Sequence, residues 1–117
     1  IESGRQAAAL LRENVRALGL DSRSRIIERP AAKVLAAISA DVVFLDPPYE
    51  LAREYAAAME RLGAAQGMQP AALVIAEHAT RAPLEPSYGT LDRVRVLRQG
   101  DSSLSFYRRR SAAPQPA

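Results

Sequence analysis

The chain has 117 residues, of which 48% are hydrophobic and 25% are charged, a balance typical of a single globular domain. It contains no cysteine and one histidine, which excludes disulfides, cysteine-bound zinc, thiol catalysis and a site built from several histidines. The formal net charge is +3 and Lys33 is the only lysine, so arginine supplies almost all of the positive charge, which favours nucleic acid as a partner.

No apolar run reaches the ~20 residues that a transmembrane helix needs, and no signal-peptide pattern opens the chain. We therefore expect a cytoplasmic monomer that binds neither a membrane nor a metal ion.

The chain opens with Ile1 and Glu2, which are predicted to end a strand. A helix is predicted to follow as far as Leu18, because Ser3 and Gln6 have the spacing of a capping box and Gly19 is a typical residue after a helix. Apolar residues at three- and four-residue steps give this helix one apolar face, formed by Ala8, Leu11, Val15 and Leu18.

The next segment is predicted to repeat the order of strand and helix. Residues Arg25 to Glu28 form a short strand candidate. Pro30 suits the first turn of a second helix, whose apolar residues are Val34, Leu35 and Ile38.

The run Val42 to Leu45 predicts a core strand, and four consecutive apolar residues indicate burial on both faces. The run stops at Asp46, and the two prolines that follow cannot continue the hydrogen-bond ladder of a sheet. Asp46 is therefore expected at the carboxyl end of a core strand, where open α/β sheets bind their ligands.

A third helix is predicted after the prolines, with Leu51, Tyr55, Met59 and Leu62 on one face and its end near residues 63–67. The run Leu73 to Ala76 then predicts another core strand, which ends at an acid, Glu77.

The C-terminal part is predicted to form an antiparallel hairpin from Leu91 to Leu97 and Ser103 to Tyr107, with Gly100 and Asp101 between the strands. Arg108 to Arg110 and the end of the chain resemble an unpacked tail, and residues 111–117 are expected to be disordered. The alternation of strands and helices before the hairpin predicts an α/β fold with a parallel sheet.

The sequence Asp46-Pro47-Pro48-Tyr49 brings together a carboxylate, a carbonyl that follows the strand and an aromatic ring on a stiff segment. Two hydrogen-bond acceptors and a stacking ring suit a planar group with N–H donors, such as the exocyclic amine of a nucleobase. Accepting the amine hydrogens at Asp46 and at the Pro47 carbonyl would localise the nitrogen lone pair and aim it at an electrophile.

These four residues resemble the (Asn/Asp)-Pro-Pro-(Tyr/Phe) motif of S-adenosylmethionine-dependent amino-group methyltransferases. More narrowly, the chain to about Arg110 resembles the RsmD-type enzymes that methylate guanine N2 in bacterial 16S ribosomal RNA. Supporting stretches are residues 11–14 and 18–20 in the first helix, the strand before the motif, Ala72 to Ile75 with Glu77, and Gly100 before Phe106 and Tyr107.

The resemblance implies a Rossmann-like class I methyltransferase sheet with helices on both faces, a C-terminal antiparallel hairpin and S-adenosylmethionine as cofactor. Ribosomal RNA or a small-subunit assembly particle would be the partner. Asp46, Pro47, Pro48 and Tyr49 match the catalytic motif, and Asp46 also borders the cofactor. Glu2 matches the acid that binds the ribose hydroxyls of the cofactor. Where the family has an acceptor near the adenine this chain has Pro30, so the Ala31 N–H is expected to contact the adenine instead.

The strand order implied by the resemblance is three, two, one, four, five, seven, six, but no Gly-rich strand-to-helix loop precedes Glu2. We therefore expect residues 1–110 to be a partial methyltransferase domain with an exposed strand edge beside Val42 to Leu45, and we do not expect it to catalyse alone.

Other interpretations remain open from the sequence. A DNA amino-methyltransferase shares the tetrapeptide but needs a target-recognition region. Glutamine methylation on a protein would be favoured by Asn at position 46, and a non-catalytic RNA-binding remnant would fit the missing loop. Glu77 and His78 are expected to be exposed loop residues without a catalytic role. Some arginines are candidates for phosphate contacts: Arg93, Arg95, Arg98 and Arg108 to Arg110.

Overall fold

A computed structural model describes residues 1–47, 52–65, 68 and 71–110 of the chain. These residues fall into two compact units, Ile1–Leu35 and Ala36–Ala117. No helix in the described ranges is long and apolar enough to span a bilayer.

The first unit contains helix α1, Arg5–Ala17. The N-cap residue is Gly4 and no side chain caps the helix, so the predicted capping box is wrong. The reason is that the helix begins one residue later than Ser3 requires. The predicted end is confirmed, because Gly19 has φ 66° and its N–H donates to the Arg16 carbonyl at 3.1 Å.

The rest of the first unit is less regular than predicted. The Glu2 N–H donates to the Ile27 carbonyl at 2.9 Å, as in a strand pair, but neither segment is a strand. The predicted second helix is wrong: the chain forms only short 3-10 helices, η2 at Ala31–Lys33 and η3 at Leu35–Ala37. Between them Val34 has φ −120°, which leaves the helical region and prevents the two turns from joining.

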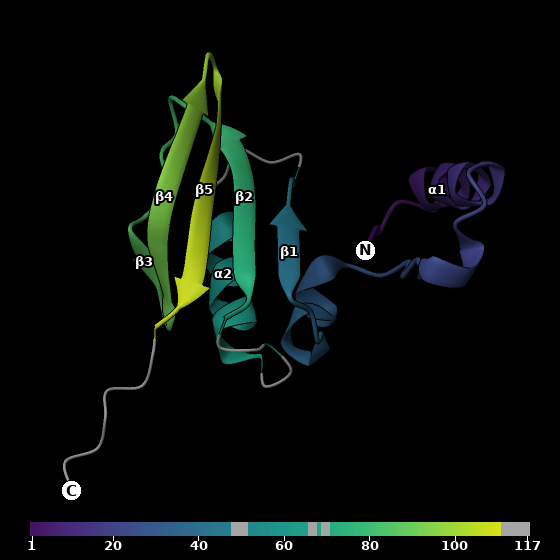
Figure 1. Cartoon of the computed structure of the whole chain (residues 1–117), viewed down its shortest axis with the longest axis horizontal. Helices are drawn as coiled ribbons and strands as arrows, with labels where there is room; N and C mark the ends of the chain where they lie inside the picture. The colour runs from purple at the N-terminus through teal and green to yellow at the C-terminus, as the bar shows by residue number, and fades with distance from the viewer. Residues whose placement is uncertain (48–51, 66–67, 69–70, 111–117) are drawn as a thin grey trace, which may run out of the picture. The chain divides into compact units, whose positions relative to one another are not determined.

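The second unit is a five-stranded mixed sheet with one long helix, α2, at Ala52–Ala64 (Figure 1). The strands lie in the order β1-β2-β5-β4-β3, and their bounds are Val42–Leu45, Leu73–Ala79, Ser102–Arg109, Leu91–Gln99 and Ser87–Tyr88 respectively. The first four of these correspond to the order four, five, seven, six expected from the resemblance. The predicted hairpin is confirmed, with Gly100 at φ 63° in the turn between β4 and β5.

Helix α2 supplies the core on one face of the sheet. Tyr55, Met59 and Leu62 are buried, which confirms the predicted apolar face, whereas Leu51 lies outside the described residues. The side chains of β2 alternate between half-buried and buried, and Val74 and Ala76 are both fully buried. The sheet therefore buries one face well and the other only partly.

The predicted burial of Val42 to Leu45 on both faces is wrong. Val43 is buried, but Val42 and Phe44 on the opposite face are 60% and 55% exposed. In the described part of the chain β1 pairs only with β2 and forms an edge of the sheet. The expected exposed edge beside this strand is therefore present.

Arg109 fixes the end of α2 to the last strand. Its guanidinium donates to four carbonyl oxygens in and after the last turn of the helix, those of Leu62, Gly63, Ala65 and Met68, at 2.7 to 3.5 Å. Carbonyls at a helix C-terminus lack partners within the helix and carry partial negative charge, so a cation there stabilises them. Arg108 and Arg109 thus belong to β5, and the prediction that they form an unpacked tail is wrong.

We expect Arg109→Ala to lower the free energy of unfolding by about 2 kcal/mol, because a charge-assisted donor to several carbonyls is lost. Arg109→Lys should retain part of this stability, because an ammonium keeps the charge but not the planar fork. Arg98→Ala, at an exposed site in β4, is the matched control and should change stability by less than about 0.5 kcal/mol. Urea denaturation measures all three, and equal effects of Arg98→Ala and Arg109→Ala would contradict this role.

Candidate active site

Two carboxylates lie side by side just beyond the point where the parallel pairing of β1 with β2 ends. The register pairs Leu45 of β1 with Ala76 of β2, so the next residues, Asp46 and Glu77, stand beside each other on one face of the sheet. Partial burial and the neighbouring Glu77 carboxyl both raise the pKa of Asp46 above its ordinary value. The Asp46 carboxyl therefore holds a proton more readily than an isolated aspartate.

Glu77 is held from two sides. The Tyr55 hydroxyl of α2 donates to the Glu77 carbonyl oxygen at 2.8 Å, and the Ser102 hydroxyl of β5 donates to Glu77 Oε1 at 3.0 Å. Burial, followed by the charges of Asp46 and Glu77, raises the pKa of Tyr55, which keeps its proton available for that bond. The expectation that Glu77 is a loop residue is wrong, because it lies within β2.

His78 is also placed differently from the expectation. It is 7% exposed, and its Nε2 lies 2.8 Å from the Ser105 hydroxyl. Its Nδ1 lies 3.0 Å from the Ala79 carbonyl and 3.1 Å from the Ala82 carbonyl. Since carbonyls only accept, Nδ1 carries a proton and donates to them. The imidazole connects β5 to the loop after β2.

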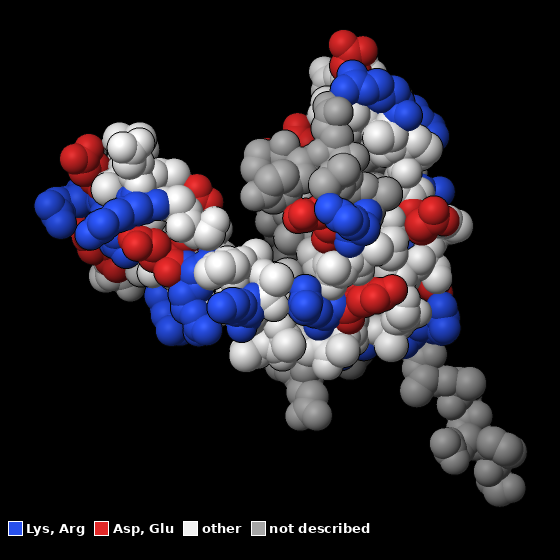
Figure 2. Space-filling view, turned by 180° about the vertical axis from the view of Figure 1, so that it is seen from behind, with Lys and Arg blue, Asp and Glu red and all other residues white. Residues whose placement is uncertain are grey.

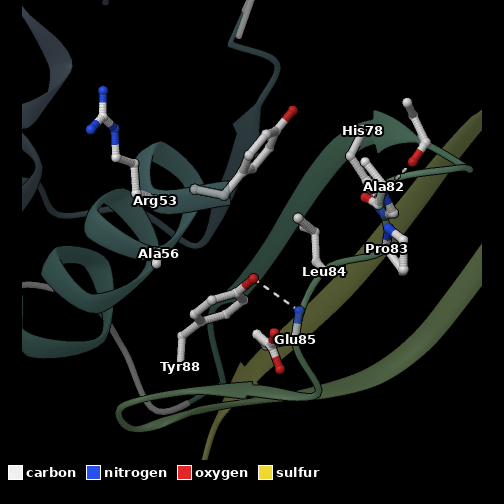
Figure 3. Close-up of a pocket in the computed structure, with 10 residues that line it drawn as sticks. Arg53, Ala56, His78, Ala82, Pro83, Leu84, Glu85 and Tyr88 are labelled. Atoms are coloured by element: carbon white, nitrogen blue, oxygen red, sulfur yellow. Dashed lines mark hydrogen bonds between the residues drawn. The ribbon is translucent and has the colours of Figure 1, made fainter. Parts of the chain in front are cut away.

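A cavity of about 310 Å³ opens on the α2 side of these residues (Figure 3). Its buried walls come from four different elements, namely Tyr55 of α2, His78 of β2, Leu84 of the following loop and Tyr88 of β3. Because successive side chains of a strand point to opposite faces, His78 enters the cavity while Glu77 points to the other face of the sheet. The Tyr55 hydroxyl, bonded to the Glu77 carbonyl, connects the two regions.

The predicted site residues fall into three groups. Asp46 and Pro47 follow β1 directly in the second unit, and Pro48 and Tyr49 lie outside the described residues. Glu2 and Ala31 lie in the first unit. Glu2 is half-buried, its N–H is bonded to Ile27, and a Cβ on Gly4 would stand 3.2 Å from its Oε1, so the glycine leaves room for this carboxylate.

Most of the arginines proposed for phosphates make internal bonds. Arg93 donates to the Leu84 carbonyl, Arg108 to the Ala71 carbonyl, and Arg110 forms a bidentate pair with Asp92 at 2.8 and 2.9 Å. The Arg95 guanidinium lies over the Phe106 ring at 5.8 Å. Figure 2 shows basic and acidic side chains interspersed on the face in view. Charge alone does not mark out a nucleic-acid surface there.

The family of the chain follows from comparison with known proteins. A family model described as conserved hypothetical protein 95 matches residues 1–108. The chain belongs to that family. The predicted resemblance to RsmD-type methyltransferases is thereby confirmed. No curated protein matches the chain.

Solved structures support the methyltransferase fold. A conserved hypothetical protein from Streptococcus pyogenes is similar with a TM-score of 0.78 and 26% identity, covering 92% of this chain and 68% of that one. HI0767 from Haemophilus influenzae, described as a proposed methylase, has a TM-score of 0.75 and 23% identity, covering 94% of this chain and 70% of that one. YhhF from Escherichia coli, described as a proposed methyltransferase, has a TM-score of 0.80 and 20% identity, covering 95% of this chain and 63% of that one. The Rossmann-like class I fold is confirmed.

The sequence interpretation missed the pairing of Glu77 with Asp46 and the part played by Tyr55. A signal for the first was present, because both acids directly follow apolar runs that were predicted to be core strands. The strand order implied by the resemblance also placed these two strands side by side, and only the register that brings the two acids level was missing. For Tyr55 the sequence indicated burial but gave no sign of its hydroxyl partner.

The raised pKa of Asp46 has a consequence for stability. A carboxyl whose pKa is higher in the folded state contributes stability below its ordinary pKa of 3.8 and loses that contribution as the pH rises through the raised value. We therefore expect Asp46→Asn to raise the urea midpoint at pH 7 and to give no gain at pH 3. Asp41→Asn, at the other end of β1, is the control and should show no such pH-dependent gain. A gain from Asp46→Asn of equal size at both pH values would contradict the carboxyl pair.

Proposed function

We propose that the protein transfers a methyl group from S-adenosylmethionine to the exocyclic N2 amine of a guanine in small-subunit ribosomal RNA. The observation that carries the proposal is the position of Asp46 and the Pro47 carbonyl. Both follow the carboxyl end of β1, beside the Glu77 carboxyl of the neighbouring parallel strand β2. Open α/β sheets bind substrates at this edge, and two acceptors there suit an amine that carries two hydrogens.

The residues of the first unit fit part of a nucleoside cofactor. The Glu2 carboxylate has space beside Gly4 and could accept two ribose hydroxyls, and the backbone N–H of Ala31 is the proposed donor to the adenine. When bound, S-adenosylmethionine supplies an activated methyl group on a sulfonium. In the second unit, Asp46 is proposed to border the amine of the substrate.

Positioning is the main contribution proposed for the chain's own residues. Asp46 and the Pro47 carbonyl accept the two amine hydrogens, which turns the nitrogen lone pair out of conjugation with the base and aims it at the methyl carbon. Tyr49 is proposed to hold the base by stacking. As the carbon–nitrogen bond forms, the nitrogen gains a methyl group and must lose a proton. The Asp46 and Glu77 carboxyls are the proposed acceptors of that proton, in keeping with the raised pKa of Asp46.

The RNA substrate is favoured by the arginine-rich composition and by the resemblance to RsmD-type enzymes. The protein is proposed to act as a monomer on ribosomal RNA or on a small-subunit assembly particle. A DNA amino-methyltransferase would use the same acceptor residues, so the nature of the methylated base decides between the two.

The test is methyl transfer from labelled S-adenosylmethionine to 16S RNA, small-subunit particles or DNA by a protein in which residues 1–110 stand within a complete methyltransferase domain. The modified base is identified by mass spectrometry. We expect N2-methylguanine in RNA, and Asp46→Ala should lower the rate about 100-fold or more because an acceptor that orients the amine is lost. Asp41→Ala, at the other end of β1, is the matched control and should retain the rate.

Other outcomes would overturn the proposal. Methylated adenine or cytosine in DNA would replace it with the DNA enzyme. Absence of transfer to any of the three substrates, together with no binding of S-adenosylhomocysteine in a calorimetric titration, would replace it with a non-catalytic RNA-binding role.

A further inference from the structure

The cavity beside the carboxylate pair has walls that are fixed before any ligand arrives. Residues 82–85, which form one wall, are neither helix nor strand, yet side chains from other elements hold their backbone. His78 donates to the Ala82 carbonyl and Arg93 to the Leu84 carbonyl at 3.0 Å. The Tyr88 hydroxyl accepts from the Glu85 N–H at 2.9 Å, and the Tyr107 hydroxyl donates to the Glu85 carbonyl at 2.7 Å.

These bonds persist at physiological pH. Burial is the main cause that raises the pKa of Tyr107 to about 12, so its hydroxyl remains a donor. The rings of Tyr88 and Tyr107 also contact each other, with centroids 5.7 Å apart and planes inclined by 55°. A loop tied at four backbone groups and backed by two packed rings is a preformed wall, which lowers the entropy lost when a ligand binds.

The interior of this cavity is mostly apolar and aromatic. Tyr55, His78, Leu84 and Tyr88 are buried, and the polar atoms of the three rings already have partners in the protein. In Figure 3, Leu84 lies between α2 and the end of β2, facing the open space. A ligand inside would therefore meet ring faces and aliphatic groups, which suits a flat and weakly polar group.

Charges of opposite sign stand among the exposed residues that line the cavity. Arg53 comes from the first turns of α2, and Glu85 comes from the fixed loop. A guanidinium pairs well with phosphate, and a carboxylate accepts from the N–H groups of a base. The apolar interior suits a flat base, and in Figure 3 the Arg53 guanidinium extends outward from α2, so a phosphate that it contacts would lie outside the cavity. The volume of about 310 Å³ is at the small end for ligand pockets and suits a single nucleotide.

The cavity is next to the acceptor residues but separate from them. Its wall residue Tyr55 is bonded to the carbonyl of Glu77, whose carboxyl lies beside Asp46. Glu77 and His78 are consecutive in β2 and point to opposite faces, so a ligand beside His78 does not occupy the space at Asp46. The backbone at the end of β2 therefore separates the cavity from the acceptor residues.

We propose that this cavity binds an unpaired base of the RNA that neighbours the methylated guanine, with Arg53 at its phosphate and Glu85 at its amino edge. The inference rests on the proposed function for the identity of the ligand. It adds a second base-binding position, which would make the enzyme select its target by an adjacent nucleotide as well as by the guanine itself.

The test uses a filled cavity and a matched helix variant. Ala56 lines the cavity and is half-buried, whereas Ala57 follows it on α2 and is exposed, so Ala56→Phe fills the cavity and Ala57→Phe adds the same ring elsewhere. Arg53→Ala removes the cation, with Arg61→Ala as its control. Binding of guanosine monophosphate and of short unpaired RNA is followed by amide NMR shifts without cofactor.

We expect amide NMR shifts at Ala79, Leu84 and Tyr88. Ala56→Phe should weaken binding of the nucleotide and of the RNA about tenfold or more, and Arg53→Ala about threefold. Both control variants should bind nearly as well as the unchanged protein. Because Arg53 is exposed, its substitution keeps the test valid if Ala56→Phe fails to fold. The inference is wrong if the shifts lie elsewhere, or if RNA containing the target guanine is methylated at the same rate after Ala56→Phe. Cavity shifts without any methyl transfer would support the nucleotide site and overturn the proposed function.

Discussion

The parallel pairing of β1 with β2 is the interaction on which the candidate active site depends. Because side chains alternate along a strand, a slip of one residue would send Asp46 to the opposite face and separate it from Glu77. The short β1 cannot secure this register alone. It is secured by β2, which pairs with β5 along its whole length and carries the buried side chains that meet α2. The position of Asp46 beside Glu77 therefore depends on the pairing and packing of β2, at residues some distance from the two acids.

Much of the second unit could be predicted because its signals are local. An apolar run ended by an acid and two prolines gave β1 with its observed bounds, and the spacing of Tyr55, Met59 and Leu62 gave the buried face of α2. The same patterns could not tell whether another element covers the second face of β1, so the exposure of Val42 and Phe44 was missed. Pro30 and the apolar residues after it suggested a helix, but the chain forms only two single 3-10 turns, because the backbone of Val34 leaves the helical region between them.

The candidate site was predictable in its motif and not in its surroundings. Asp46 and Pro47 are contiguous, so one short stretch of sequence identifies them. The partners of Glu77 come from α2 and β5, and no sequence spacing predicts that they meet. The arginines show the same limit. Arg109 looked like part of a cationic tail, yet it serves α2, because the carbonyls at the end of that helix lie beside the last strand.

The four hydrogen bonds that hold the backbone of residues 82–85 also affect which ligands the cavity can accept. A flexible loop can close around ligands of several sizes, and it loses conformational freedom each time. In this chain the freedom of the loop is lost once, when the protein folds, and the loop cannot widen later without breaking bonds made by His78, Arg93, Tyr88 and Tyr107. Such a wall selects ligands by excluding those that do not fit, because it cannot change shape to accept them. Changes in ligand preference would then require substitutions in the sheet that supports the loop as well as in the loop itself.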